Sequence, residues 1–191
     1  MNKLRIGYCY NLIDNFTFEK NQPEDSNAEW TSNEDVLTLR NGMLNAGFDV
    51  IDVGNPERLI DMNVRSQIDI VFSIAEMTGY RFRESIAPVL CELFKIPYVL
   101  SAPDVLTVAL DKHLSNLLVR NINILTPDWT LIKTMADFDQ VTFDKPAYIL
   151  KPVAEGSSIG ISKESVVRTR EHAVSRADYL LQMYKEPVLL Q

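Results

Sequence analysis

Four apolar runs of strand length alternate with helical patterns in the first half of the chain. The runs cover residues 4–10, 49–53, 68–75 and 98–101, and a clear helical pattern lies at 84–94. Strands that alternate with helices are usually joined by right-handed βαβ crossovers, which leave the strands parallel. The sequence therefore predicts an α/β fold with a mostly parallel sheet in this half.

A long polar stretch between the first two runs leads into a helix. Residues 11–31 are rich in Asn, Asp, Glu and Pro, which predicts a loop or a short helix rather than a strand. Ser32 and Asp35 have the spacing of a capping box at the start of a helix. Gly47 suits the end of that helix, because glycine readily adopts the left-handed conformation found there.

The second half predicts a different architecture, in which helices accompany an antiparallel sheet. Its predicted elements are one or two helices at 105–121, strands at 129–132 and 147–153, a helix at 168–184, and a strand that begins at 188. The predicted organisation is thus a parallel α/β domain at residues 1–102, followed by an α+β domain with an antiparallel sheet at residues 103–191.

Composition excludes several classes of protein. Of the 191 residues 46% are hydrophobic, and the net charge of −7 argues against a nucleic-acid or anionic-membrane partner. Cys9 and Cys91 lie in apolar runs, so we expect buried thiols rather than a disulfide or a metal pair. The N-terminus has no signal-peptide pattern, and no apolar run approaches the ~20 residues that span a bilayer. We therefore expect a cytoplasmic protein.

The segment from Tyr148 to Ser162 carries the clearest chemical signal. An apolar run ends at Lys151, and a short loop follows in which Gly156 and Gly160 flank two serines. Glycines let backbone N–H groups approach an anion, and a lysine adds positive charge. We expect residues 159–162 to form a second strand, so that a phosphate would lie under a hairpin. The loop alone equally fits an ordinary Gly-Ser turn with an exposed lysine.

Three motifs together favour the phosphate interpretation. The segment from Lys151 to Ser162 resembles the lysine and serine-glycine loop of the D-alanine–D-alanine ligases and their relatives in the ATP-grasp superfamily. Ile96-Pro97-Tyr98 followed by Asp111-Lys112 is similar to a second signature of that family, and Thr126-Pro127-Asp128-Trp129 to a third. The resemblance implies a pre-ATP-grasp α/β domain followed by the first half of an ATP-grasp domain.

The resemblance also implies an activity. In this family ATP phosphorylates a carboxylate, and an amine attacks the acyl-phosphate to form an amide bond, so the implied cofactors are ATP and Mg²⁺. Small carboxylate and amine substrates and a possible homodimer are the implied partners. The residues implied to hold the nucleotide are Lys112, Lys151, Glu155, Gly156, Ser157, Ser158 and Gly160. Ser157 is also the implied catalytic residue, because the matching serine places a substrate-binding side chain.

Substrate-binding residues are less well matched. Glu34 or Asn33 would correspond to a glutamate that recognises the amino group of D-alanine, but helix capping is the better explanation of this acidic cluster. Residues 76–84 replace a histidine- and glycine-rich stretch of the ligases and contain no histidine, which puts D-alanine in doubt as the substrate. Arg81 and Arg83 are candidates for binding a different carboxylate, since guanidinium pairs with carboxylate through two hydrogen bonds.

Chains of the family continue well beyond the last strand of this sequence. We therefore expect the magnesium ligands to lie beyond Gln191 and the chain alone to perform no ligation. His113 and His172 have no partner at a metal-ligand spacing. One alternative is a non-catalytic module that binds a nucleotide or a carboxylate. Another is a structural fragment whose last strand lies exposed at a sheet edge and pairs with another copy.

Overall fold

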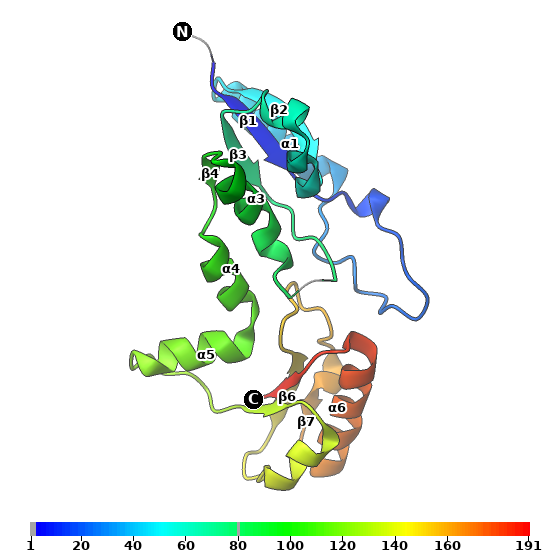
Figure 1. Cartoon of the computed structure of the whole chain (residues 1–191). Helices are drawn as coiled ribbons and strands as arrows, with labels where there is room; N and C mark the ends of the chain where they lie inside the picture. The colour runs from blue at the N-terminus through cyan, green and yellow to red at the C-terminus, as the bar shows by residue number, and fades with distance from the viewer. Residues whose placement is uncertain (1–2, 80) are drawn as a thin grey trace. The chain divides into compact units, whose positions relative to one another are not determined.

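The computed structural model describes residues 3–79 and 81–191, which form two compact units (Figure 1). The first unit comprises the chain up to Thr17 together with Glu29–Thr107, and the second comprises Phe18–Ala28 together with Val108–Gln191. The short polar segment Phe18–Ala28 thus belongs with the second half of the chain. Within the described residues, no helix combines the length and the apolar character needed to cross a membrane.

The first unit contains the predicted parallel sheet. Its strand order is β2-β1-β3-β4, and every pairing is parallel. The strands are β1 (Arg5–Cys9), β2 (Asp49–Gly54), β3 (Ile70–Ser73) and β4 (Tyr98–Val99). The polar stretch that follows β1 contains a 3₁₀ helix (Ile13–Asn15) and no strand, as predicted.

The helices of the first unit begin and end largely where the sequence indicates. Ser32 caps α1 (Asn33–Asn45) by accepting a hydrogen bond from the N–H of Asp35, and Gly47 follows the helix with φ +95°. The predicted helix after β3 is α3 (Ile86–Phe94). Shorter helices cover Pro56–Ile60, α2 (Met62–Arg65) and Arg83–Ser85.

The two cysteines lie in the core of this unit, as the sequence predicts. Cys9 and Cys91 are buried free thiols that belong to one cluster with Val53, Leu59 and Val71. Burial disfavours the thiolate and raises the pKa of each thiol to about 12. Neither cysteine is therefore poised to act as a nucleophile or a metal ligand at neutral pH.

The second unit contains an antiparallel sheet with the strand order β5-β8-β6-β7. The strands are β5 (Thr130–Ile132), β6 (Tyr148–Pro152), β7 (Val166–Val167) and β8 (Val188–Leu190). β8 pairs with both β5 and β6 and is fully buried. The expectation that this last strand lies at an exposed edge is therefore wrong.

The predicted strand at residues 159–162 is also wrong. These residues form turns, and the strand that pairs with β6 in the hairpin is β7 instead. The physical reason is the backbone before and within the segment, because Ser157, Ser158 and Gly160 have φ values of +44°, +64° and +73°. Left-handed residues at these positions turn the chain and prevent an extended ladder.

Helices cover the second sheet differently on its two faces. α6 (Arg170–Tyr184) packs Ala173, Ala177 and Leu180 against one face, and Figure 1 shows it alongside β6 and β7. A smaller cluster on the other face contains Leu189 and Leu110, the last residue of α4 (Pro103–Leu110). α5 (Lys112–Asn121) follows directly, and a 3₁₀ helix lies at Met135–Gln140.

Candidate functional site

Lys151 lies on the face of the second sheet that α6 does not cover. Side chains alternate along a strand, and the preceding Leu150 belongs to the cluster under α6. Lys151 is opposite Leu189 in the ladder, and its ammonium donates to the side-chain oxygen of Gln191 at 2.7 Å. The side chain is half-buried, and desolvation lowers its pKa. Within the described part of the chain, no carboxylate forms an ion pair with this ammonium group.

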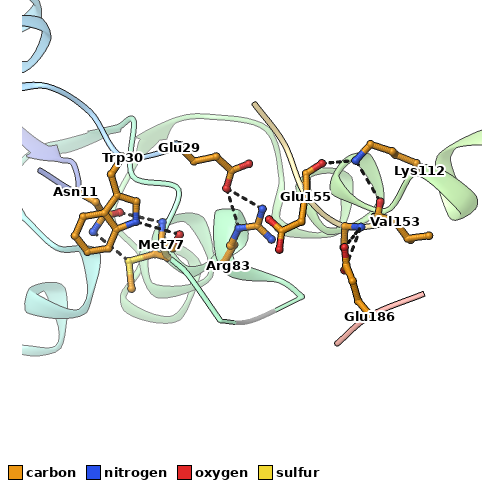
Figure 2. A network of polar contacts seen from close by, with 10 residues as sticks. Asn11, Glu29, Trp30, Met77, Arg83, Lys112, Val153, Glu155 and Glu186 are labelled. Carbon is orange, nitrogen blue, oxygen red and sulfur yellow. Dashed lines mark hydrogen bonds and ion pairs between the residues drawn. The ribbon is translucent and has the colours of Figure 1, made fainter. Parts of the chain in front are cut away.

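Lys112 forms hydrogen bonds with the residues that follow β6. It opens α5, whose N-terminus is capped by Asp111 through hydrogen bonds from the N–H groups of His113 and Leu114. The backbone N–H of Lys112 donates to the carbonyl of Val153 at 3.0 Å. Its ammonium also reaches that carbonyl, at 3.4 Å, and the carbonyl of Glu155, as Figure 2 shows.

The carboxylate of Glu186 also accepts hydrogen bonds from the stretch that follows β6. The N–H of Ala154 donates to both oxygens of this carboxylate, at 3.1 and 3.2 Å (Figure 2). The N–H of Val153 donates to the carbonyl of Pro187 at 3.0 Å. The start of the serine-glycine loop is thus fixed between α5 and the residues just before β8.

Three consecutive N–H groups of the serine-glycine loop are available to an anion. The N–H groups of Ile159 and Ile161 are used within the loop, by the carbonyls of Gly156 and Ser158. Those of Gly156, Ser157 and Ser158 have no acceptor among the described residues, and both serine side chains are exposed. Left-handed non-glycine residues cost about 1–3 kcal/mol each and often accompany functional loops. The predicted backbone contact with phosphate is thus compatible with the hydrogen bonding at these three positions.

Gly160 differs from the other predicted loop residues. Its N–H donates to the carboxylate of Asp25 at 2.7 Å, so this group is already satisfied within the chain. Sequence reasoning did not identify Asp25, which lies 135 residues earlier in a polar segment without a recognisable motif.

In the first unit, Arg83 and Glu29 form a buried ion pair. The guanidinium donates twice to one oxygen of Glu29, from Nε at 3.1 Å and from Nη2 at 2.8 Å (Figure 2). Each side chain is only 5% exposed. A substrate carboxylate at Arg83 would therefore compete with Glu29, which the sequence did not single out. Arg81 is exposed, and Glu34 is exposed on the first turn of α1.

Glu76 and Glu84 lie close to Glu29, and the three acidic side chains form a cluster. Oxygens of Glu29, Glu76 and Glu84 lie within 4.8 Å of one another. Burial raises the pKa of Glu76 to about 7, with Glu84 and Glu29 adding to the effect and Arg83 opposing it. Asn11 fixes the neighbouring backbone, because its side-chain oxygen accepts from the N–H of Met77 at 3.0 Å (Figure 2).

This raised pKa predicts that Glu76→Gln stabilises the protein only at higher pH. A carboxyl whose folded-state pKa is raised from 4.5 to about 7 contributes stability below about pH 4.5, and this contribution is lost as the pH rises through 7. With a discount for partial exposure, we expect the variant to match the wild type near pH 5 and to exceed it by about 1 kcal/mol near pH 8. Urea denaturation at both pH values measures the difference. An equal difference at both would contradict the interpretation.

The described residues of the second unit contain no group of three carboxylate, imidazole or thiol ligands close enough to share a cation. Among the described residues, the one group of three acidic side chains close enough to share a cation is Glu29, Glu76 and Glu84, in the first unit. Arg83 already places a positive charge on that group. The described residues of the second unit thus offer no ready cage of three carboxylates for Mg²⁺, which in nucleotide sites is usually held by one or two carboxylates and the phosphates.

Comparisons with known proteins identify related sequences. No protein-family model matches the chain. The D-alanine–D-alanine ligase of Aquifex aeolicus is 34% identical over 86 residues, which are 44% of this chain and 30% of that protein. The D-alanine–D-alanine ligase A of Bacillus cereus is 25% identical over 123 residues, 63% of this chain and 40% of that protein.

Solved structures with the same fold align with 98–100% of this chain. The D-Ala:D-Ser ligase VanG of Enterococcus faecalis has a TM-score of 0.71 at 16% identity, over 100% of this chain and 63% of that one. The D-alanine–D-alanine ligase of Bacillus anthracis complexed with ATP has a TM-score of 0.66 at 16% identity, over 98% of this chain and 58% of that one. The chain thus spans less than two thirds of the proteins that it resembles.

Proposed function

We propose that the second unit of this chain binds ATP. The proposal draws on the resemblance to D-alanine–D-alanine ligases, and on a fold like that of a pre-ATP-grasp domain followed by part of an ATP-grasp domain. The ATP would serve an ATP-dependent carboxylate–amine ligase. In that reaction the γ-phosphoryl group passes to a carboxylate, and an amine displaces phosphate from the acyl-phosphate. Small-molecule carboxylate and amine substrates follow from this chemistry.

The observation that carries the proposal is the half-buried ammonium of Lys151, which lacks an acidic partner among the described residues. Leaving a charge partly desolvated and unneutralised costs free energy, and such residues often belong to functional sites. An anionic phosphate beside Lys151 would remove that cost. Lys112 supports the same location, since its backbone and ammonium both contact the residues that follow the Lys151 strand.

The serine-glycine loop and the two lysines would then bind the phosphate groups of ATP. The free N–H groups of Gly156, Ser157 and Ser158 would donate to phosphate oxygens, and the two lysines would neutralise them. Gln191, which Lys151 contacts, lies next to the nucleotide in this arrangement. Mg²⁺ bound with ATP would lower the barrier by neutralising the γ-phosphate. We expect its ligands to be other than the described residues of this chain.

The first unit is the proposed location of substrate recognition. Glu29, Glu76 and Glu84 outnumber Arg83 in their cluster, which favours the ammonium group of a substrate there. Arg81 is exposed and is the more accessible candidate for a substrate carboxylate. Since residues 76–84 differ from the ligases in composition, we do not assign D-alanine as the substrate.

The test is ATP binding by this chain and its lysine variants. A ligand at 100 times its Kd stabilises a protein by about 2.7 kcal/mol, which thermal denaturation detects readily. We expect Lys151→Ala to abolish most of the stabilisation by ATP and Lys112→Ala a smaller part. Lys151→Arg should restore it only partly, because a planar guanidinium presents its donors differently from an ammonium.

Lys145→Ala provides the matched control. Lys145 is an exposed lysine of the same unit, three residues before β6, and its pairing with Asp144 is weak at 3.9 Å. This variant should bind ATP like the wild type. Unchanged ATP affinity in Lys151→Ala would refute the proposed site, whereas an equal loss in both variants would point to non-specific attraction.

The second candidate function is a module that binds the nucleotide without turnover. It is favoured by the lysines and the unpaired loop N–H groups, which belong to the described residues of the second unit and need no metal to bind an anion. Phosphate release from ATP in the presence of amino acids tests this candidate. Steady release by the purified chain would exclude the non-catalytic module. ATP binding without release is expected of both candidates, because we expect the magnesium ligands to be other than the described residues.

A further inference from the structure

We propose that Asp25 is a positioning residue for the serine-glycine loop, and that it holds the loop in the shape that accepts phosphate. Asp25 belongs to the segment Phe18–Ala28, which lies in the second unit although its neighbours in sequence lie in the first. The inference rests on the proposed function, since it concerns the same nucleotide site.

Asp25 makes three contacts with residues far along the chain. One carboxylate oxygen accepts from the N–H of Gly160 at 2.7 Å. The hydroxyl of Tyr184, the last residue of α6, donates to the two oxygens at 2.9 and 3.1 Å. Hydrogen bonds to a charged acceptor contribute about 1.5–3 kcal/mol each, more than those between neutral groups. Burial and Asp25 together raise the pKa of the Tyr184 phenol, which keeps it a donor.

Gly160 is held on its carbonyl side as well. Nη2 of Arg176 donates to the Gly160 carbonyl at 3.0 Å and to the hydroxyls of Ser162 and Ser165 at 3.2 and 3.1 Å. An acidic and a basic side chain thus bind the N–H and the carbonyl of the same residue. Together they fix the left-handed conformation of Gly160 at the end of the loop.

This arrangement divides the loop into two functional parts. Gly160 is an anchor whose N–H cannot also bind phosphate, and a phosphate at that position would face the carboxylate of Asp25. Gly156, Ser157 and Ser158 keep their N–H groups free. Asp25 therefore acts through the loop and does not touch the nucleotide.

A cavity makes the Asp25 contact important for the segment itself. Residues 21–25 line a cavity of about 770 Å³ together with Tyr179, Met183 and Tyr184. Because the segment and α6 line the same cavity, the polar contacts of Asp25 help to hold the segment against the loop.

The test compares Asp25→Ala with the matched control Glu24→Ala. Glu24 is the adjacent, exposed carboxylate, so its removal changes the charge equally without changing the loop. We expect Asp25→Ala to weaken ATP binding about 10-fold, which corresponds to one lost charge-assisted hydrogen bond. Glu24→Ala should remain within about 2-fold of the wild type.

A spectroscopic readout separates positioning from general destabilisation. In the wild type, the Gly160 amide proton should resonate downfield because a carboxylate accepts it at short distance. Asp25→Ala should move this signal upfield and broaden those of Ser157 and Ser158, while signals of the first unit remain unchanged. If the alanine variant does not fold, Asp25→Asn retains the shape and removes the charge, and it is judged by the same measurements.

The outcomes of this inference and of the proposed function are distinguishable. If the wild-type chain does not bind ATP, the proposed function fails and the inference fails with it. If the wild type binds ATP and the Asp25 variant binds it equally well, only the inference is overturned. A weaker Asp25 variant with an unmoved Gly160 signal would also overturn it, because the effect would not pass through the loop.

Discussion

Gly160→Ala is expected to destabilise the second unit by about 2–5 kcal/mol. The residue has φ +73°, where alanine costs about 1–2 kcal/mol. A Cβ atom there would lie 2.4 and 2.8 Å from two ring atoms of Pro152 and 3.2 Å from the ring of Tyr184. Overpacking of this kind adds about 1–3 kcal/mol, because a proline ring within a strand cannot move aside.

Tryptophan fluorescence can follow the second unit separately. Trp129 lies in the second unit and Trp30 in the first, so a Trp30→Phe background leaves Trp129 as the reporter during urea denaturation. Gly42→Ala is the control, because a methyl group added there would meet no atom within 4 Å outside its own helix and chain neighbours. Gly42 lies in α1 of the first unit, so this variant is measured through Trp30 in a Trp129→Phe background. It should be neutral or stabilising by up to about 1 kcal/mol. A Gly160→Ala protein as stable as the wild type would contradict the described loop geometry.

Arg83→Met is expected to destabilise the first unit by about 3–5 kcal/mol. Removal of the guanidinium leaves Glu29, only 5% exposed, without its cation and close to Glu76 and Glu84. Breaking a buried ion pair is costly because the remaining charge stays desolvated. Urea denaturation in a Trp129→Phe background, where Trp30 reports on the first unit, measures the loss.

Arg5→Met is the control for the loss of an arginine from the same unit. Its pair with Asp69 is 41% and 35% exposed, so the loss should stay below about 1 kcal/mol. Adding Glu29→Gln to Arg83→Met should recover part of the stability, because it removes the unpaired charge. Equal losses for the two arginine variants would show that burial does not set the strength of the Arg83 pair.

The elements with strong local signals were predictable from the sequence. The strands of the first unit are apolar runs between helical patterns, and this alternation specifies a parallel sheet. Ser32, Asp35 and Gly47 mark the ends of α1 through short-range hydrogen bonds and backbone conformation. The resemblance to D-alanine–D-alanine ligase-like proteins was likewise predictable from three short motifs, and the comparisons confirm it.

Features that depend on distant partners were not predictable. The tract at 159–162 alternates like a strand, but two left-handed serines before it redirect the chain, and serine gives little local indication of that conformation. The contact of Asp25 with Gly160 joins residues 135 positions apart. Glu29 likewise meets Arg83 from a polar loop without a motif. Nothing in their local sequence distinguishes these acidic residues from solvated ones.

The interior position of β8 has a consequence for synthesis on the ribosome. β8 separates β5 from β6, so these two earlier strands have no direct ladder between them. While Val188–Leu190 are still untranslated, a nascent chain can assemble the parallel sheet of the first unit, but the second sheet lacks its centre. Domains tend to fold as units in the order of their synthesis. The emerging second unit therefore exposes two unjoined strands, and is most open to misassembly and chaperone capture, until Val188–Leu190 leave the ribosome.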